Sequence, residues 1–186
     1  MPPLSSDDRR SLLALARRAV LELVLHHSFA EVPALAGRLA EPGSAFVTLH
    51  CFSKLRGCIG RTDGALSLGE TVAQCAISAA AHDPRFLPIA QDDLPGLEIE
   101  ISVLSEFQPL SPQLIVPGIH GLLVARGDHR GLLLPQVAAE RRWSAERFLE
   151  ETCEKAGLDR NAWRDPRTIV FVFTAEVFSE VNAQSA

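Results

Sequence analysis

Apolar residues recur along this chain with two different periods. Between residues 6 and 27 they return every three or four positions, which is the spacing of one face of a helix. Ser5 with Asp8 three residues later marks the start of that helix as a capping pair. Leu97–Val103 instead alternates strictly between apolar and polar residues, as a strand with one buried face does. The pattern predicts a chain that contains both helices and strands.

Two pairs of short apolar runs predict β-hairpins. Ala45–Phe52 and Leu55–Gly60 flank a turn near Ser53-Lys54 that lacks the Asn-Gly sequence favoured in two-residue turns. Gly121–Ala125 and Gly131–Leu134 flank a second polar turn. Because hairpins join neighbouring strands, we expect a mainly antiparallel sheet.

A helix is predicted after each hairpin. Ser67 and Glu70 form a capping box at the start of the first helix, which should end before Asp83-Pro84. Pro135 suits the first turn of a short helix, and residues 144–157 carry helical periodicity that ends at a glycine. The last strong strand is predicted over Ile169–Val177.

The order of these elements predicts an internal duplication. Arg56-Gly57 and Arg130-Gly131 are 74 residues apart (56 to 130), and the closing strands that begin at Leu97 and Ile169 are 72 apart (97 to 169). Similar offsets for unlike landmarks favour a repeated β-β-α-β unit. We therefore expect an α+β fold: one compact domain over 1–186 with about four helices and two lobes. The expected lobes are 1–105 plus 166–186, and 106–165.

Composition and charge narrow the classes of function. The 186 residues are 47% hydrophobic and 22% charged, as in ordinary globular domains. Eighteen basic against 23 acidic residues give a formal charge of -5, which argues against a nucleic-acid partner. The first residues are acidic and polar, unlike an export signal, and Leu12–Leu25 contains too many charges to span a membrane. We expect a cytoplasmic protein without a membrane partner.

The cysteines and histidines do not follow a metal-binding pattern. The four cysteines, at positions 51, 58, 75 and 153, include no C-x-x-C pair, and the six histidines lack the i, i+4 spacing of a helical metal site. We therefore expect reduced thiols and neither a metal site nor a cofactor.

The segment Leu55–Gly60 is the best candidate for chemistry. In an extended strand Arg56 and Cys58 are two positions apart and should project from one face, while Gly57 allows a ligand or another backbone to approach. A guanidinium next to a thiol favours the thiolate, which is the nucleophilic form. The alternatives are that Cys58 packs as a small hydrophobic residue and that Arg56 pairs with a carboxylate such as Glu100.

Four further residues are candidates for a binding site. Asp83 and Arg85 follow the second helix, where they either line a cleft or end the helix by local hydrogen bonds. His120 precedes a strand, and Gln136 lies at a helix start, where free N–H groups can meet an anion.

Six segments, in this order along the chain, resemble the AMMECR-one domain family, whose hallmark is the Arg-Gly-Cys segment. They are Ala45–Leu49, Leu55–Gly60, Asp83–Phe86, Glu100–Leu104, Gly131–Val137 and Lys155–Leu158. The resemblance covers almost the whole chain and implies a two-lobed α+β fold with a suspected site near the hallmark. It implies no reaction, because no catalytic activity is established for the family. The chain departs from the family at Phe52-Ser53-Lys54, where a glycine-containing turn is usual, and at His82.

Prokaryotic members of the family resemble protein A of the AmmeMemoRadiSam system, which implies a Memo-like protein and a radical SAM protein as partners. The first hypothesis is accordingly an accessory or ligand-binding factor with a small anionic ligand. Its candidate ligand-binding residues are Arg56, Gly57, Cys58, Asp83, Arg85, Glu100, His120 and Gln136. The alternative is an enzyme in which Cys58 is a nucleophile or redox thiol and Arg56 is its activator or an anion clamp.

Overall fold

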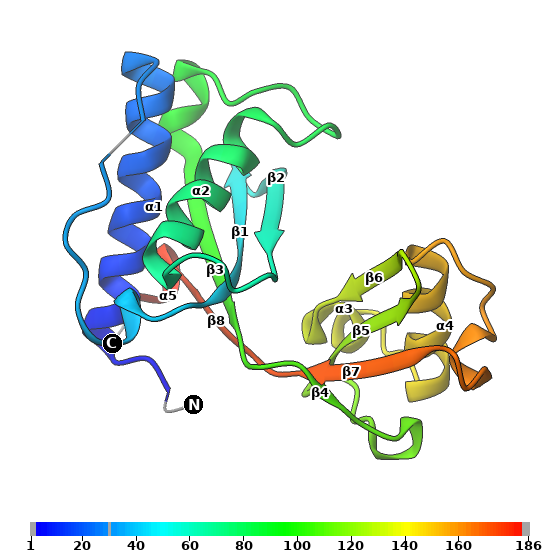
Figure 1. Cartoon of the computed structure of the whole chain (residues 1–186). Coiled ribbons are helices and arrows are strands. Elements are labelled where there is room, and N and C mark those ends of the chain that lie inside the picture. The colour runs from blue at the N-terminus through cyan, green and yellow to red at the C-terminus, as the bar shows by residue number, and fades with distance from the viewer. Residues whose placement is uncertain (1–2, 30, 184–186) are drawn as a thin grey trace. The chain divides into compact units, whose positions relative to one another are not determined.

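The computed structural model describes residues 3–29 and 31–183 and confirms the expected α+β fold (Figure 1). The α-helices are α1 (Ser6–His26), α2 (Leu68–Ala81), α3 (Pro135–Glu140), α4 (Ala145–Lys155) and α5 (Glu180–Ala183). The strands are β1 (Ser44–Cys51), β2 (Lys54–Arg61), β3 (Leu97–Leu104), β4 (Gln108–Pro109), β5 (Gly121–Arg126), β6 (His129–Leu133), β7 (Ile169–Phe173) and β8 (Ala175–Ser179). Contacts divide the chain into two compact units, Met1–Val103 with Glu176–Ala186, and Leu104–Ala175.

In the first unit, helices α1 and α2 cover one face of a sheet with the strand order β2-β1-β3-β8 (Figure 1). Along β1 buried and half-buried residues alternate, so Val47 and Leu49 enter the core while Thr48 and His50 lie on the opposite face. The expected capping boxes at Ser5 and Ser67 are both formed. They satisfy backbone N–H groups that the first helical turn leaves without partners. The predicted starts of both helices are confirmed.

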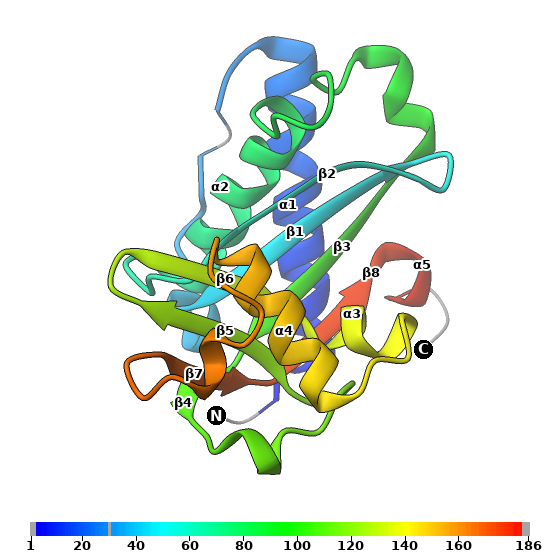
Figure 2. The same ribbon diagram turned by 90° about the vertical axis from the view of Figure 1, so that its right-hand side faces the viewer.

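The second unit contains a sheet with the strand order β4-β7-β5-β6. Helix α4 packs against this sheet, and the core of the unit lies between them (Figure 2). Phe148 and Leu149 of α4 are fully buried, together with Leu122 and Val124 of β5. The second predicted hairpin is confirmed as β5 and β6, which pair in antiparallel register. Pro135 occupies the first turn of α3, as the sequence predicts.

The two sheets share one topology, which supports the predicted duplication. When the strands of each sheet are named from the edge strand that carries Arg-Gly, the orders are β2-β1-β3-β8 and β6-β5-β7-β4. The hairpin strands and the closing strand (β3 or β7) therefore occupy equivalent places in the two sheets. A Cβ on Gly57 would lie 2.0 Å from the carbonyl oxygen of Ala79 in α2, and a Cβ on Gly131 would lie 2.4 Å from the amide nitrogen of Ala156, just after α4. In both units a helix therefore packs closely against the glycine of the Arg-Gly strand.

Three sequence predictions differ from the structure. The strand predicted over Ile169–Val177 is two strands, because the chain leaves the second sheet at Thr174 and continues as β8 in the first. Since β7 pairs with β4 and β5, it belongs to the second unit, whereas the expected lobe boundary at residue 166 assigned it to the first. The first hairpin turns at Phe52 and Ser53, one residue earlier than expected, and both have positive φ, 50° and 62°. Within the described part of the chain, every helix is too short or too polar to cross a membrane.

Candidate functional site

The hairpin of β1 and β2 places Cys58 opposite Thr48 and contains a bulge next to it. The register runs from Leu49 opposite Gly57 directly to His50 opposite Leu55, so Arg56 is an extra residue on β2. A bulge interrupts the regular alternation of side chains. For this reason the spacing of two positions does not by itself put Arg56 and Cys58 on one face of β2.

Arg56 is held by a carboxylate from a distant segment. Its Nη1 lies 2.6 Å from Oδ1 of Asp93, in the 3₁₀ segment Gln91–Gly96, and both side chains are largely buried. Asp93 also accepts the backbone N–H of Ala90 at 2.9 Å. This backbone hydrogen bond, followed by the one from Arg56, holds the pKa of Asp93 below its ordinary value. Arg56 thus fastens β2 to the 3₁₀ segment through Asp93.

Asp83 and Arg85 together close the free edge of β2 at Cys58, and we name this pair the edge clamp. Oδ2 of Asp83 accepts the backbone N–H of Cys58 at 2.9 Å, and Nη2 of Arg85 donates to the carbonyl oxygen of Cys58 at 3.1 Å. Arg85 also donates to both carboxylate oxygens of Asp83, at 2.9 and 2.7 Å. The two side chains take the place of a neighbouring strand, since β2 is at the edge of its sheet.

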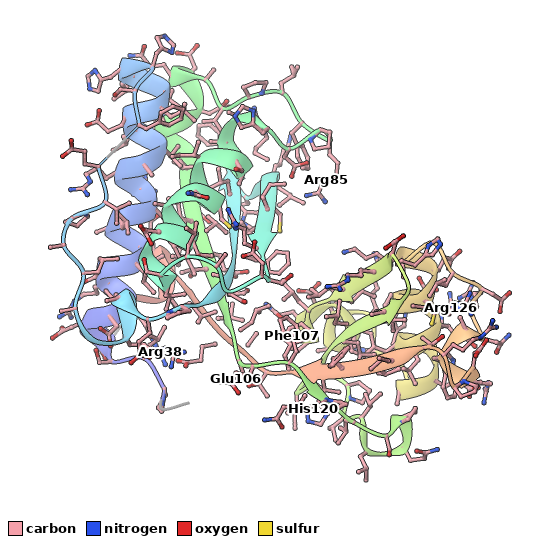
Figure 3. All side chains as sticks on the ribbon, in the orientation of Figure 1. Arg38, Arg85, Glu106, Phe107, His120 and Arg126 are labelled. Atoms are coloured by element: carbon pink, nitrogen blue, oxygen red, sulfur yellow. The ribbon has the colours of Figure 1, made fainter. Side chains whose placement is uncertain are left out.

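The clamp is built on the turn that ends α2. The backbone N–H of Phe86 donates to the carbonyl of Asp83, and that of Ile89 donates to the carbonyl of Ala80, which folds the segment back beside the helix. Figure 3 shows Arg85 on the loop that follows α2. The carboxylate of Asp83 is buried, with 2% of its side chain exposed, whereas 55% of the Arg85 side chain is exposed. The hydrogen bond from Arg85 is the main reason that the pKa of Asp83 lies well below its usual range.

Cys58 is the least buried of the four cysteines. Its Sγ accepts a hydrogen bond from the Thr48 hydroxyl at 3.3 Å, and the residue is half-buried, whereas Cys51, Cys75 and Cys153 are buried. Burial raises the pKa of the Cys75 thiol to about 11 and also raises the pKa values of Cys51 and Cys153. The guanidinium that borders Cys58 in the structure belongs to Arg85, through the carbonyl contact described above.

The other predicted site residues belong to other elements of the fold. Glu100 is half-buried on β3, in the same sheet as the hallmark hairpin, as the sequence predicts, but Ser102 on the same strand is buried. His120 (Figure 3) and Gln136 belong to the second unit. Nδ1 of His120 accepts the backbone N–H of Val116 at 3.1 Å, and Gln136 lies in the short helix α3.

Thr48 and Asp93 are two residues of the site that the sequence patterns did not identify. Counting strand partners from the hairpin turn finds Thr48 opposite Cys58 only if the bulge at Arg56 is included. No pattern in Gln91–Gly96 marks Asp93, because its role depends on a contact across 37 positions of the chain. In the described residues, no group of three His, Cys, Asp or Glu side chains is placed to hold a metal ion.

The arrangement suits recognition better than proton transfer. The acidic groups of the site are already paired with arginines, so each carboxylate is fixed in its ionised form. The Cys58 sulfur accepts a hydrogen bond from a hydroxyl group, which is a poor base near neutral pH, and the Cys58 thiol also interacts electrostatically with the Arg85 guanidinium. The residues open to a partner are the half-buried Cys58 and the exposed part of Arg85.

Comparison with known proteins places this geometry in a family. The family model described as AMMECR1 matches residues 13–178. A protein of Methanothermobacter thermautotrophicus is 42% identical, with 96% of this chain and 97% of that protein covered. A protein of Thermococcus kodakarensis is also 42% identical, over 91% of this chain and 88% of its own length.

A solved structure agrees with the fold as well as the sequence. An uncharacterized protein from Pyrococcus horikoshii, whose crystal structure is known, is 39% identical to this chain in sequence. The two structures superpose with a TM-score of 0.87, over 94% of this chain and 92% of that one. The names of these relatives state no activity. Since the family model and the relatives cover nearly the whole chain, the protein belongs to the AMMECR1 family.

Proposed function

We propose that this chain is an accessory factor that presents its Arg-Gly-Cys strand as a rigid recognition surface for a partner protein in the cytoplasm. The partners are a Memo-like protein and a radical SAM protein, as the resemblance to protein A of the AmmeMemoRadiSam system implies. The observation that carries the proposal is the edge clamp. Its side chains hydrogen-bond to both the backbone N–H and the carbonyl oxygen of Cys58 and so fix this part of the strand.

A fixed surface binds at a lower entropic cost than a mobile one, because fewer side chains and loops become ordered on binding. The ion pair between Arg56 and Asp93 fixes β2 at a second point. Between these two points lies Gly57, against which α2 packs. The hallmark residues thus maintain one shape, and Cys58 and Arg85 are the groups that a partner or a small anionic ligand would contact.

The alternative function is an enzyme that uses Cys58 as a nucleophile or redox thiol. A nucleophilic cysteine needs an adjacent base or a strongly positive environment to form the thiolate. The structure supplies a hydroxyl from Thr48 next to Sγ, and the positive charge of Arg85 is largely offset by the Asp83 carboxylate. These contacts favour recognition. Roles of Glu100, His120 and Gln136 in ligand binding stay predictions.

Binding of the purified full chain to the Memo-like and radical SAM proteins of the same organism tests the proposal. Isothermal titration calorimetry should show saturable binding to at least one of them, weakened at least about tenfold by Arg85→Gln, because a charged contact contributes about 1.5–3 kcal/mol. Arg61→Gln is the matched control, since Arg61 lies on the same strand in an exposed ion pair with Asp63. Far-UV circular dichroism must show that each variant is folded.

Three results would decide against recognition. If neither protein binds, or if the Arg85 and Arg61 variants bind alike, the strand is not the recognition surface. If Cys58→Ser binds both partners as tightly as the unaltered chain but fails to complement a deletion strain, the enzyme alternative is favoured, because serine keeps the shape while weakening nucleophilicity.

A further inference from the structure

A small pocket in the second unit, away from the Arg-Gly-Cys strand in sequence, has the properties of a binding site. Its volume is about 340 Å³, and its lining includes Leu110, Pro112, Trp163, Thr168 and Ile169. It lies beside β7 where the pairing with β4 ends, because the last bond on that edge is from the N–H of Leu110 to the carbonyl of Val170. The volume is at the lower end of the range for small-molecule sites.

Two polar atoms of this lining lack a hydrogen-bond partner. The indole Nε1 of Trp163 and the hydroxyl Oγ1 of Thr168 are buried and unpaired, and Thr168 as a whole is only 9% exposed. Most buried polar groups in proteins are paired, because leaving one unpaired is costly. Both residues line the pocket, so a molecule bound there lies next to the two unpaired groups.

Both groups are held in place without a ligand. The guanidinium of Arg164 lies 4.0 Å from the ring centre of Trp163 and forms an ion pair with Glu146, so the indole is fixed from one side. The backbone N–H of Thr168 donates to the carbonyl of Asp165 at 2.9 Å, which fixes the turn that carries the hydroxyl. A site with these groups is preorganised.

The two groups together select a kind of ligand. An indole N–H only donates, whereas a threonine hydroxyl both donates and accepts. A carboxamide offers one carbonyl acceptor and one N–H donor next to each other, so it satisfies both. The nearby Arg164 and Arg167 are already paired with Glu146 and Asp165, which favours an uncharged molecule. We infer that this pocket binds a small uncharged ligand through a carboxamide group.

The test uses the full chain labelled with nitrogen-15 and the probe N-acetylalanine methylamide. Titration should shift the indole N–H signal of Trp163 saturably in the NMR spectrum, while the indole signal of Trp143, which lines a different pocket, stays unchanged. Thr168→Val removes a hydroxyl group and keeps the shape, whereas Trp163→Phe removes the indole N–H together with one ring. Binding to the Trp163 variant is followed by the backbone N–H signal of Ile169, because this variant has no indole signal at position 163. Each substitution should weaken binding about three- to tenfold, the effect of one neutral hydrogen bond.

Thr71→Val is the control, because Thr71 is also buried but its hydroxyl donates to the carbonyl of Gly43 at 3.0 Å. It should leave probe binding unchanged and lower the melting temperature, whereas Thr168→Val in the ligand-free chain should leave the melting temperature unchanged or raise it. The inference is overturned if the Trp163 signal does not saturate, if Thr168→Val binds the probe normally, or if Thr168→Val lowers the melting temperature as much as Thr71→Val.

Discussion

The carboxylate of Asp83 accepts the backbone N–H of Cys58 at 2.9 Å, across 25 positions of the chain. This contact joins two of the segments that carry the family resemblance, the Arg-Gly-Cys strand and the Asp-Pro-Arg-Phe turn. It gives the turn a structural task, because the edge of β2 would otherwise present unpaired backbone groups.

Asp83→Asn should lower the free energy of unfolding by about 1–3 kcal/mol, because a buried charge-assisted hydrogen-bond network is weakened. The loss of stability is no larger because Arg85, the partner of Asp83, is exposed to solvent, which weakens the ion pair. Urea unfolding measures the change. Asp63→Asn is the control, since Asp63 makes an exposed pair with Arg61, and it should behave like the unaltered chain.

The effect of Asp83→Asn should depend on pH. The pKa of Asp83 is lowered in the folded state, so its contribution is fully present above the unfolded value of about 3.9 and is lost as the pH falls below it. The stability difference between the variant and the unaltered chain should therefore shrink below about pH 4. A difference that grows with acid would contradict the paired, ionised Asp83.

Iodoacetamide should label one cysteine of the native protein first, and that cysteine should be Cys58. The thiols of Cys51, Cys75 and Cys153 are buried and their pKa values are raised, so they should react only after unfolding in urea. Mass spectrometry of timed samples measures the order. Cys58→Ser should abolish the early product, and early labelling of Cys75 would show that the face of α2 packed against β1 is open to the reagent.

Gly57→Ala and Gly131→Ala should each destabilise the chain by about 3 kcal/mol, because the added methyl group would meet backbone atoms of the packed helix or the turn just after it. Gly96→Ala is the control and should cost less, since its methyl group would meet the outer ring atoms of Phe52, an exposed side chain that can move aside. Chemical unfolding compares the three. A neutral Gly131→Ala would show that the two units are not equivalent at this position.

Ser53→Gly should stabilise the protein by about 1 kcal/mol. Ser53 has a φ of 62° in the hairpin turn, where glycine is favoured because it lacks a Cβ. Thermal unfolding measures the change. Ser179→Gly, a change within strand β8, is the comparison and should destabilise instead.

The sequence alone determined the helices, the two hairpins and the duplicated order of elements, because periodicity and capping are local properties. Ser5 and Ser67 identify helix starts by residues only three positions away. The same local patterns identified Cys58 as the residue of interest and Asp83 and Arg85 as its candidate companions.

The tertiary structure decided which groups touch. The bulge at Arg56 interrupts the alternation that puts Arg56 and Cys58 on one face of a regular strand, and Arg56 pairs with Asp93. No local pattern reveals a bulge that depends on pairing with β1. The division of Ile169–Val177 into β7 and β8 likewise depends on which sheet offers hydrogen bonds, and not on the residues themselves, which are apolar throughout much of that stretch. Orphan atoms such as Thr168 Oγ1 are visible only once packing shows which polar groups have lost water without gaining a partner.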